Sequence, residues 1–232
     1  IVRGDGFKSR PVHFKMKKNK KIKAVVFDLG NTLIKTKNKY RKYFNRKHNI
    51  NLSKQKYGKI FSDVFNKACW NNVDKAFAEF AIKCGKKDNH DFINDVRKIW
   101  NNEHKNHVLF REAKPLIREL KNSGYKVALL SNHTQRCRDI LDYHGLTLYF
   151  HFIGISAEQN MRKPDARFFR HVLKHLKVAP EEALMVGDSY EKDYVPAKKL
   201  GMHALLIERK KKKYKHSIRS LRQVNSYLKV HN

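Results

Sequence analysis

The sequence of 232 residues has few cysteines and no long apolar run, and both absences exclude classes of protein. Its three cysteines, Cys69, Cys84 and Cys137, are an odd number without CxxC spacing, which argues against a disulfide framework and a zinc ribbon. No apolar run approaches the ~20 residues that cross a bilayer, and the N-terminus has no apolar signal-peptide core. We expect a soluble protein in a reducing compartment, either cytoplasmic or organellar, with no membrane partner.

Short motifs of several enzyme classes are also missing. No Walker loop, GxGxxG or GxSxG occurs. His171 and His175 have the i, i+4 spacing of a metal pair on a predicted helix, but no third ligand is in view and a solvated helix face is the better interpretation. The RGDG stretch at residues 3–6 indicates only a turn.

Acidic residues are scarce relative to basic ones, 21 against 52, so the formal net charge is +31. Such a charge attracts polyanions at low salt, including RNA. The basic residues fall in three separate segments, however, at residues 16–23, 35–47 and 208–215, whereas a nucleic-acid binder often concentrates them in one stripe. We expect a generally basic exterior, with residues 1–20 as a basic tail in which Met16 is a plausible start.

Five short apolar runs bounded by turn signals predict buried parallel strands, and amphipathic helical patterns separate the last four of them. This alternation is typical of an α/β fold, a doubly wound parallel sheet with helices on both faces. The predicted strands are residues 23–27, 126–130, 152–156, 183–187 and 203–207, and the helical patterns cover 114–124, 165–176 and 193–201.

The segment from residue 36 to 107 has a different pattern, in which aromatic and aliphatic residues recur at i, i+3 and i+4. Triples such as Tyr40, Tyr43 and Phe44 predict about four helices whose aromatic side chains form a core. We therefore expect an α/β core at 21–35 and 108–232 with an inserted helical cap at 36–107.

Four polar motifs fall at the predicted carboxyl ends of successive strands, where open parallel sheets bind ligands. Together they resemble the haloacid dehalogenase superfamily of aspartate-nucleophile hydrolases with an α-helical cap. The resemblance runs from about residue 22 to the end, where residues 216–228 are similar to the family's closing helix. The motifs are FDLGNTL (27–33), LLSNHT (129–134), MRKPD (161–165) and VGDSYEKD (186–193).

The resemblance implies a nucleophile and a Mg²⁺ site. Asp28 would accept a phosphoryl group as an aspartyl-phosphate, which splits one hard displacement into two easier ones. Mg²⁺ prefers oxygen ligands, and the resemblance assigns them to Asp28, the backbone carbonyl of Gly30 and Asp188. Asp193 would hold a metal-bound water or Lys163.

The resemblance also implies a phosphate site. Ser131 and the amide of Asn132 would hydrogen-bond to the phosphoryl oxygens, and Lys163 would balance charge on the nucleophile and the phosphate. Thr32 and His133 are further candidates for contact with the substrate.

Gly30 departs from the pattern of the family's phosphatases, which carry a general acid and base at this position. Its presence leaves three possibilities: an enzyme for substrates with good leaving groups or with another acid, a member like the dehalogenases, or a fold retained for binding. His133 is the nearest protonatable side chain that could replace the acid.

Asp188, directly after Gly187, favours the phosphatase branch, because carbon–halogen displacement needs no metal. We therefore predict a Mg²⁺-dependent phosphatase for a small phosphorylated metabolite. The alternative is a catalytically impaired protein that binds polyanions or RNA, for example as a ribonucleoprotein-associated subunit.

Overall fold

The computed structural model describes residues 21–37, 40–66, 70–209, 213–214 and 217–232. The predicted basic tail at 1–20, with the possible start at Met16, lies outside these residues, as do Cys69 and part of the basic segment 208–215. The other two cysteines are buried free thiols.

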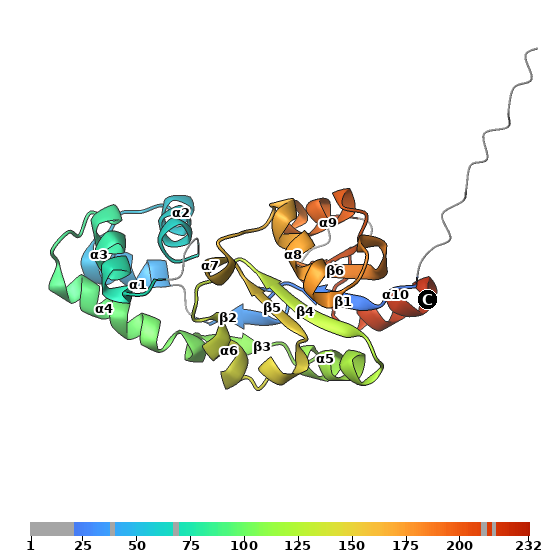
Figure 1. Ribbon diagram of the computed structural model, residues 1–232. Coiled ribbons are helices and arrows are strands. Elements are labelled where there is room, and N and C mark those ends of the chain that lie inside the picture. Colours follow the sequence, from blue (N-terminus) through green and yellow to red (C-terminus); the bar gives the residue numbers. More distant parts are fainter. Residues whose placement is uncertain (1–20, 38–39, 67–69, 210–212, 215–216) are drawn as a thin grey trace, which may run out of the picture.

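The main sheet of the described chain has five parallel strands in the order β5-β4-β1-β6-β7 (Figure 1). Each strand coincides with a predicted apolar run to within one residue at either end, so the doubly wound α/β prediction is confirmed. Four of the strands are almost wholly buried because helices cover both faces. The bounds are β1 Ala24–Phe27, β4 Lys126–Ser131, β5 Phe152–Ile155, β6 Ala183–Gly187 and β7 His203–Leu206.

Alternate residues of β1 face opposite sides of the sheet, as the two-residue period of a strand requires. Val25 and Phe27 pack in the larger hydrophobic cluster with α5 (Ala113–Asn122), α6 (Cys137–Tyr143) and α10 (Gln223–His231). Ala24 and Val26 pack in a second cluster with α8 (Ala166–Leu176) and α9 (Val195–Lys199).

Four helices within residues 40–101 form a separate bundle at one end of the molecule (Figure 1). Side-chain oxygens of Ser53, Asn72 and Asn89 cap the last three at their N-termini. The bundle has its own core of aromatic and aliphatic side chains, as predicted. Tyr43 is an exception: it is 42% exposed and donates a hydrogen bond to Asp95. The helices are α1 Tyr40–His48, α2 Lys54–Phe65, α3 Val73–Lys83 and α4 His90–Asn101.

A two-stranded antiparallel ribbon that the sequence did not predict connects this bundle to the sheet. β2 (Ile34–Thr36) carries the chain out and β3 (His107–Leu109) brings it back. Thr36 pairs with His107, at the predicted limits of the cap. The ribbon thus holds both crossings between bundle and core in one register, while the division into domains stays a prediction.

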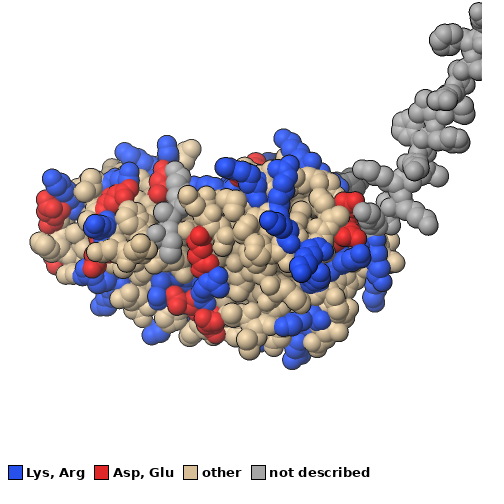
Figure 2. All heavy atoms as spheres, in the orientation of Figure 1, with Lys and Arg blue, Asp and Glu red and all other residues tan. Residues whose placement is uncertain are grey.

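The C-terminal segment is less helical than expected. The predicted helix at 216–228 begins only at Gln223, because Ile218 first forms a bridge with Ile207 beside β7. No helix among the described residues has the length and apolar character that a membrane crossing demands. Figure 2 shows Lys and Arg spread over the visible face, with Asp and Glu among them.

Candidate active site at the carboxyl edge of the sheet

The loops after β1, β4 and β6 meet at one point of the sheet edge. β1 lies between β4 and β6, and the chain leaves it toward the helical bundle, so this is where the strand order reverses. Asp28 follows β1 directly, Ser131 ends β4 and Asp188 follows β6. The amide of Asp28 donates to the carbonyl of Val186, which fixes the start of its loop against β6.

Lys163 joins two carboxylates in the interior of this site. Its Nζ lies 2.6 Å from Oδ1 of Asp28 and 2.6 Å from Oδ1 of Asp193. The three residues are 2–7% exposed, so both ion pairs are shielded from water. The second oxygen of Asp193 accepts the amide hydrogen of Ser189 at 3.0 Å. Of the two roles considered for Asp193, its contacts are those of holding Lys163.

Asp188 completes a cluster with Asp28 and Asp193, in which one oxygen of each lies within 4.8 Å of the others. The ammonium group of Lys163 is the positive charge within this cluster of three carboxylates. When all four groups are ionised, two negative charges therefore remain uncompensated within the cluster.

The pKa values respond to this imbalance. Burial raises the pKa of Asp28, Asp188 and Asp193, and repulsion from neighbouring carboxylates adds to the rise. Burial alone would lower the pKa of Lys163, but attraction to Asp28 and Asp193 raises it. Lys163 therefore stays protonated. A divalent cation would neutralise the two negative charges that remain on the cluster.

The predicted phosphate-binding residues lie around this cluster in different ways. Ser131 is buried at the end of β4, beside the loop. Asn132 holds the backbone of Lys163, donating to its carbonyl and accepting from its amide at 2.8 Å each. Thr32 is fully buried and donates to Oδ2 of Asp28 at 3.3 Å, so it orients the carboxylate.

His133 makes its contacts on another side of the loop. Its Nδ1 accepts the amide hydrogen of Thr134 at 2.9 Å, and its ring lies beside that of His107, with centroids 6.0 Å apart. Burial lowers the pKa of His133, which leaves the ring neutral near pH 7. The role of a replacement acid stays a prediction, without support from these contacts.

Two functional candidates were missed at the sequence level, Asn31 and Arg209. Asn31 has φ of 54° and donates from Nδ2 to Oδ2 of Asp188 at 3.0 Å. Arg209 donates to the carbonyl oxygens of Asn31 at 3.2 Å and Thr32 at 2.7 Å, and its charge pairs with Glu112 at 2.6 Å. The GN pair at 30–31 signals a turn, but nothing in the lysine-rich segment 208–215 distinguishes Arg209 as a clamp on the loop after β1.

Gly30 and Gly187 differ in how much room their surroundings leave. A Cβ built on Gly30 meets no atom within 4 Å, so the missing carboxylate is not excluded by space. A Cβ on Gly187 would lie 2.3 Å from Oδ2 of Asp193. Glycine at 187 is therefore what allows Asp193 to approach the end of β6 and reach Lys163.

Gly187→Ala should displace Asp193 and destabilise the protein by roughly 1–3 kcal/mol, the usual cost of overpacking a filled site. Thermal unfolding measures the change. Gly58→Ala is the control, because Gly58 lies in α2 with nothing within 4 Å of its Cβ position, and alanine in a helix should stabilise by about 0.5–1 kcal/mol. Equal unfolding temperatures for Gly187→Ala and the unsubstituted protein would contradict the close approach of Asp193.

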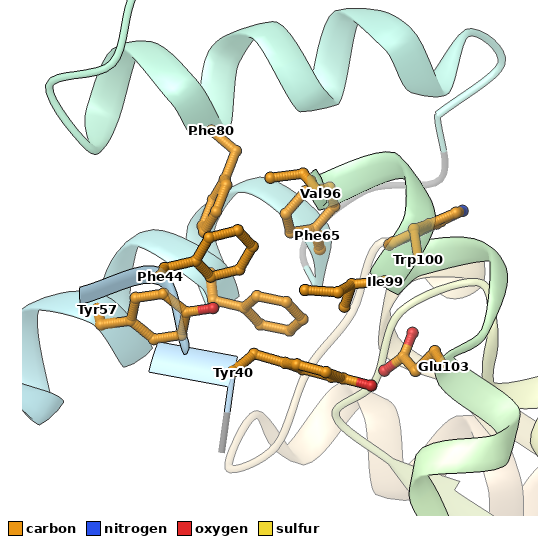
Figure 3. A pocket seen from close by; sticks show the side chains of 10 residues that line it. Tyr40, Phe44, Tyr57, Phe65, Phe80, Val96, Ile99, Trp100 and Glu103 are labelled. Carbon is orange, nitrogen blue, oxygen red and sulfur yellow. The ribbon is translucent and has the colours of Figure 1, made fainter. Parts of the chain in front are cut away.

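A small cavity lies inside the helical bundle, away from the carboxylate cluster (Figure 3). Its volume is about 30 Å³, room for about one water. The lining is aromatic and aliphatic except for Glu103, toward which the Tyr40 hydroxyl points. We interpret the cavity as a packing gap of the bundle core.

Comparisons with known proteins show to which family the chain is similar. The family model of haloacid dehalogenase-like hydrolases matches residues 25–207. A phosphoserine phosphatase from Thermus thermophilus is 38% identical over 108 residues, 46% of this chain and 43% of the relative. Haloacid dehalogenase-like hydrolase domain-containing protein 3 from Bos taurus is 37% identical over 95 residues, 41% of this chain and 38% of the relative. These two alignments span about two fifths of each relative's length.

A longer alignment and two solved structures extend the similarity. N-acylneuraminate-9-phosphatase from Mus musculus is 27% identical over 201 residues, 79% of this chain and 81% of the relative. A HAD phosphatase from Thermococcus onnurineus has a TM-score of 0.62 at 24% identity, covering 89% of this chain and 98% of that one.

A HAD family enzyme from Bacteroides thetaiotaomicron, in complex with magnesium and inorganic phosphate, has a TM-score of 0.64 at 21% identity, covering 83% and 97%. These two structures share the fold of this chain. Because the family model matches residues 25–207, and the aspartate after β1 is paired with a buried lysine as in the predicted pattern, the chain belongs to the haloacid dehalogenase-like hydrolase family.

Proposed function

We propose that this protein is a Mg²⁺-dependent phosphatase that hydrolyses small phosphorylated metabolites through an aspartyl-phosphate on Asp28. The observation that carries the proposal is the buried lysine between two carboxylates at the sheet edge, with Asp188 beside them. Two of the relatives are named as phosphatases of small molecules, phosphoserine phosphatase and N-acylneuraminate-9-phosphatase, which supports this substrate class.

The residues present suit a magnesium ion. Mg²⁺ takes oxygen ligands at near-octahedral geometry, and the cluster offers carboxylate oxygens with a net charge of −2. Asp28, Asp188 and the carbonyl of Gly30 would hold the ion, as the pattern of the family implies, while Asp193 holds Lys163 and the Ser189 amide. When bound, the ion supplies charge neutralisation between the nucleophile and the phosphate.

The chain's own groups account for the two displacement steps. The Asp28 carboxylate attacks phosphorus as the bond to the leaving oxygen breaks, and water then attacks the aspartyl-phosphate, releases phosphate and restores Asp28. Thr32 orients the carboxylate through its hydrogen bond, and the charge of Lys163 counteracts the rise in the pKa of Asp28 that burial causes. Asp193 in turn keeps Lys163 charged and in place. Ser131, at the end of β4, is the proposed donor to the phosphoryl oxygens.

The leaving oxygen needs a proton, and Gly30 offers no side chain to supply it. Substrates whose leaving groups depart without protonation, or that carry their own acid, are therefore the ones this site should hydrolyse best. Turnover of simple alkyl phosphates should be slow. The noncatalytic alternative, a polyanion-binding subunit, receives no support from the relatives.

A panel of phosphorylated metabolites, assayed with and without Mg²⁺, tests the proposal. We expect Mg²⁺-dependent release of phosphate and tight binding of beryllium fluoride with Mg²⁺, as a mimic of the aspartyl-phosphate. Hydrolysis that is equally fast in excess EDTA would overturn the magnesium role. Absence of both turnover and beryllium fluoride binding would overturn the phosphatase.

Asp188→Asn should stabilise the metal-free protein at pH 7. The pKa of Asp188 is raised above its ordinary value of 3.8, so its ionisation disfavours the folded state, and the free energy of unfolding falls as pH rises from about 4. We expect an unfolding temperature about 2–4 °C higher in EDTA for a gain of about 1 kcal/mol, and no gain at pH 3.5.

Added Mg²⁺ should reverse this order. Binding to the folded state raises the unfolding temperature of the unsubstituted protein, whereas Asp188→Asn lacks the anionic ligand and should not respond. A variant that is less stable at pH 7 in EDTA would show that charge repulsion does not strain the cluster.

A further inference from the structure

A second cluster of metal-ligating side chains lies where the chain returns from the helical bundle to the sheet. Glu103 begins the short 3₁₀ helix η1 (Glu103–Asn106), His107 begins β3, and His133 lies on the loop after β4. One ligand atom of each lies within 4.8 Å of the others. The Nε2 of His107 is 3.8 Å from Oε1 of Glu103, too long for a hydrogen bond.

His107 has an unusual environment. It is only 7% exposed, and neither of its ring nitrogens has a hydrogen-bond partner among the described residues. Leaving a buried polar group unsatisfied destabilises the folded state, and an ordered water or an ion is the usual explanation. Glu103, at 9% exposure, is a second buried polar group facing the same point.

Metal ions bind ionised carboxylates and neutral imidazoles, and the cluster offers one carboxyl group and two imidazole rings.

Two imidazoles and one carboxylate select a transition metal such as Zn²⁺ over Mg²⁺, because nitrogen ligands suit the former and oxygen ligands the latter. Ligand atoms at ~2.0–2.2 Å from one tetrahedral ion are ~3.3–3.6 Å apart. The Glu103 and His107 atoms come close to this spacing at 3.8 Å, and the full set, within 4.8 Å, needs side-chain shifts of up to about 1 Å.

One hydrogen bond opposes binding. The amide of Thr134 donates to Nδ1 of His133 at 2.9 Å, and this bond is lost whether the ion takes Nδ1 or takes Nε2 and leaves the proton on Nδ1. The loss of this bond weakens metal binding. The site should therefore bind more weakly than a structural zinc site of four preformed protein ligands.

We propose that Glu103, His107 and His133 form a binding site for a divalent transition metal ion of the Zn²⁺ type, separate from the magnesium cluster, that ties the exit of the helical bundle to the core. Glu103 and His107 lie on the returning segment, and His133 lies on the core loop that follows Ser131. An ion at this site would restrain the position of the bundle relative to that loop. The proposal does not depend on the phosphatase function.

Titration of the full chain with Zn²⁺, followed by calorimetry, and with Co²⁺, followed by visible absorption, tests this site in the presence of excess Mg²⁺. We expect one ion per chain, the intense d–d absorption of a tetrahedral Co²⁺ centre, and a higher unfolding temperature. His107→Gln and Glu103→Gln should each weaken binding by at least about tenfold, because each removes one of three ligands.

His175→Gln is the matched control. His171 and His175 are another close histidine pair, with ring centroids 4.4 Å apart, and both lie on α8 away from the bundle. Binding that survives His107→Gln but is lost in His175→Gln would assign the ion to α8 and overturn the proposal. The absence of any binding would also overturn it, and would leave a water as the partner of His107. If neither His107→Gln nor Glu103→Gln folds, the Co²⁺ spectrum of the unsubstituted protein decides between the outcomes. A tetrahedral spectrum supports the site, and an octahedral spectrum overturns it.

Discussion

Asp28→Asn should reduce phosphatase turnover by roughly 10⁴-fold or more, because an amide is neither a nucleophile for phosphorus nor an anionic metal ligand. The substitution keeps the shape of the side chain, and Lys163 retains its ion pair with Asp193. Removing a buried carboxylate whose pKa is raised should leave the variant at least as stable as the unsubstituted protein at pH 7.

Steady-state kinetics on the best substrate of the panel, with thermal unfolding of the same samples, measures both effects. Asp91→Asn is the control, since Asp91 is exposed on α4 and should keep full activity. Beryllium fluoride should no longer bind the Asp28→Asn variant. Turnover of this variant within tenfold of the unsubstituted enzyme would remove Asp28 from the mechanism.

Gly30→Asp should accelerate hydrolysis of phosphates with poor leaving groups by about 10²–10⁴-fold, the usual contribution of general acid and base catalysis. The position can accept the side chain, because no atom lies within 4 Å of the Cβ site and Gly30 does not have a positive φ. Aryl phosphates with good leaving groups should gain much less, since their departure needs little protonation.

The dependence of rate on leaving-group pKa separates acid catalysis from a general effect on the loop. We expect a steep dependence in the unsubstituted protein and a shallow one in Gly30→Asp. Gly58→Asp adds the same carboxylate at an exposed glycine of α2 and should change neither. An equal gain for aryl and alkyl phosphates would show that the new side chain acts through charge or metal binding instead.

The sequence by itself determined the strands, because a strand buried on both faces must be apolar throughout and short. Residues 23–27 and 183–187 therefore showed their structure directly. The helices of the bundle could also be predicted from the sequence, since their aromatic residues repeat with the helical period. Asp28 and Asp188 could be named because the carboxyl ends of parallel strands meet at one edge.

Contacts between side chains that are far apart in the sequence leave no periodic pattern of residues. The contact of Asn132 with the phosphate stays a prediction, but no pattern of residues indicated that both ends of its side-chain amide bind the backbone of Lys163, 31 residues away. Arg209 stands in a lysine-rich segment that looked like solvated surface, yet it clamps the loop after β1 from 177 residues away. The sequence shows that a basic residue is present. Which residue it contacts depends on the loops that the fold brings together.

The junction between bundle and sheet was likewise decided by the tertiary structure alone. Glu103 and His107 are close in sequence, but His133 reaches them only because β3 pairs with β2 and returns the chain beside the loop after β4. Burial and the few hydrogen-bond partners available there depend on packing from three separate segments, which no local pattern of residues encodes.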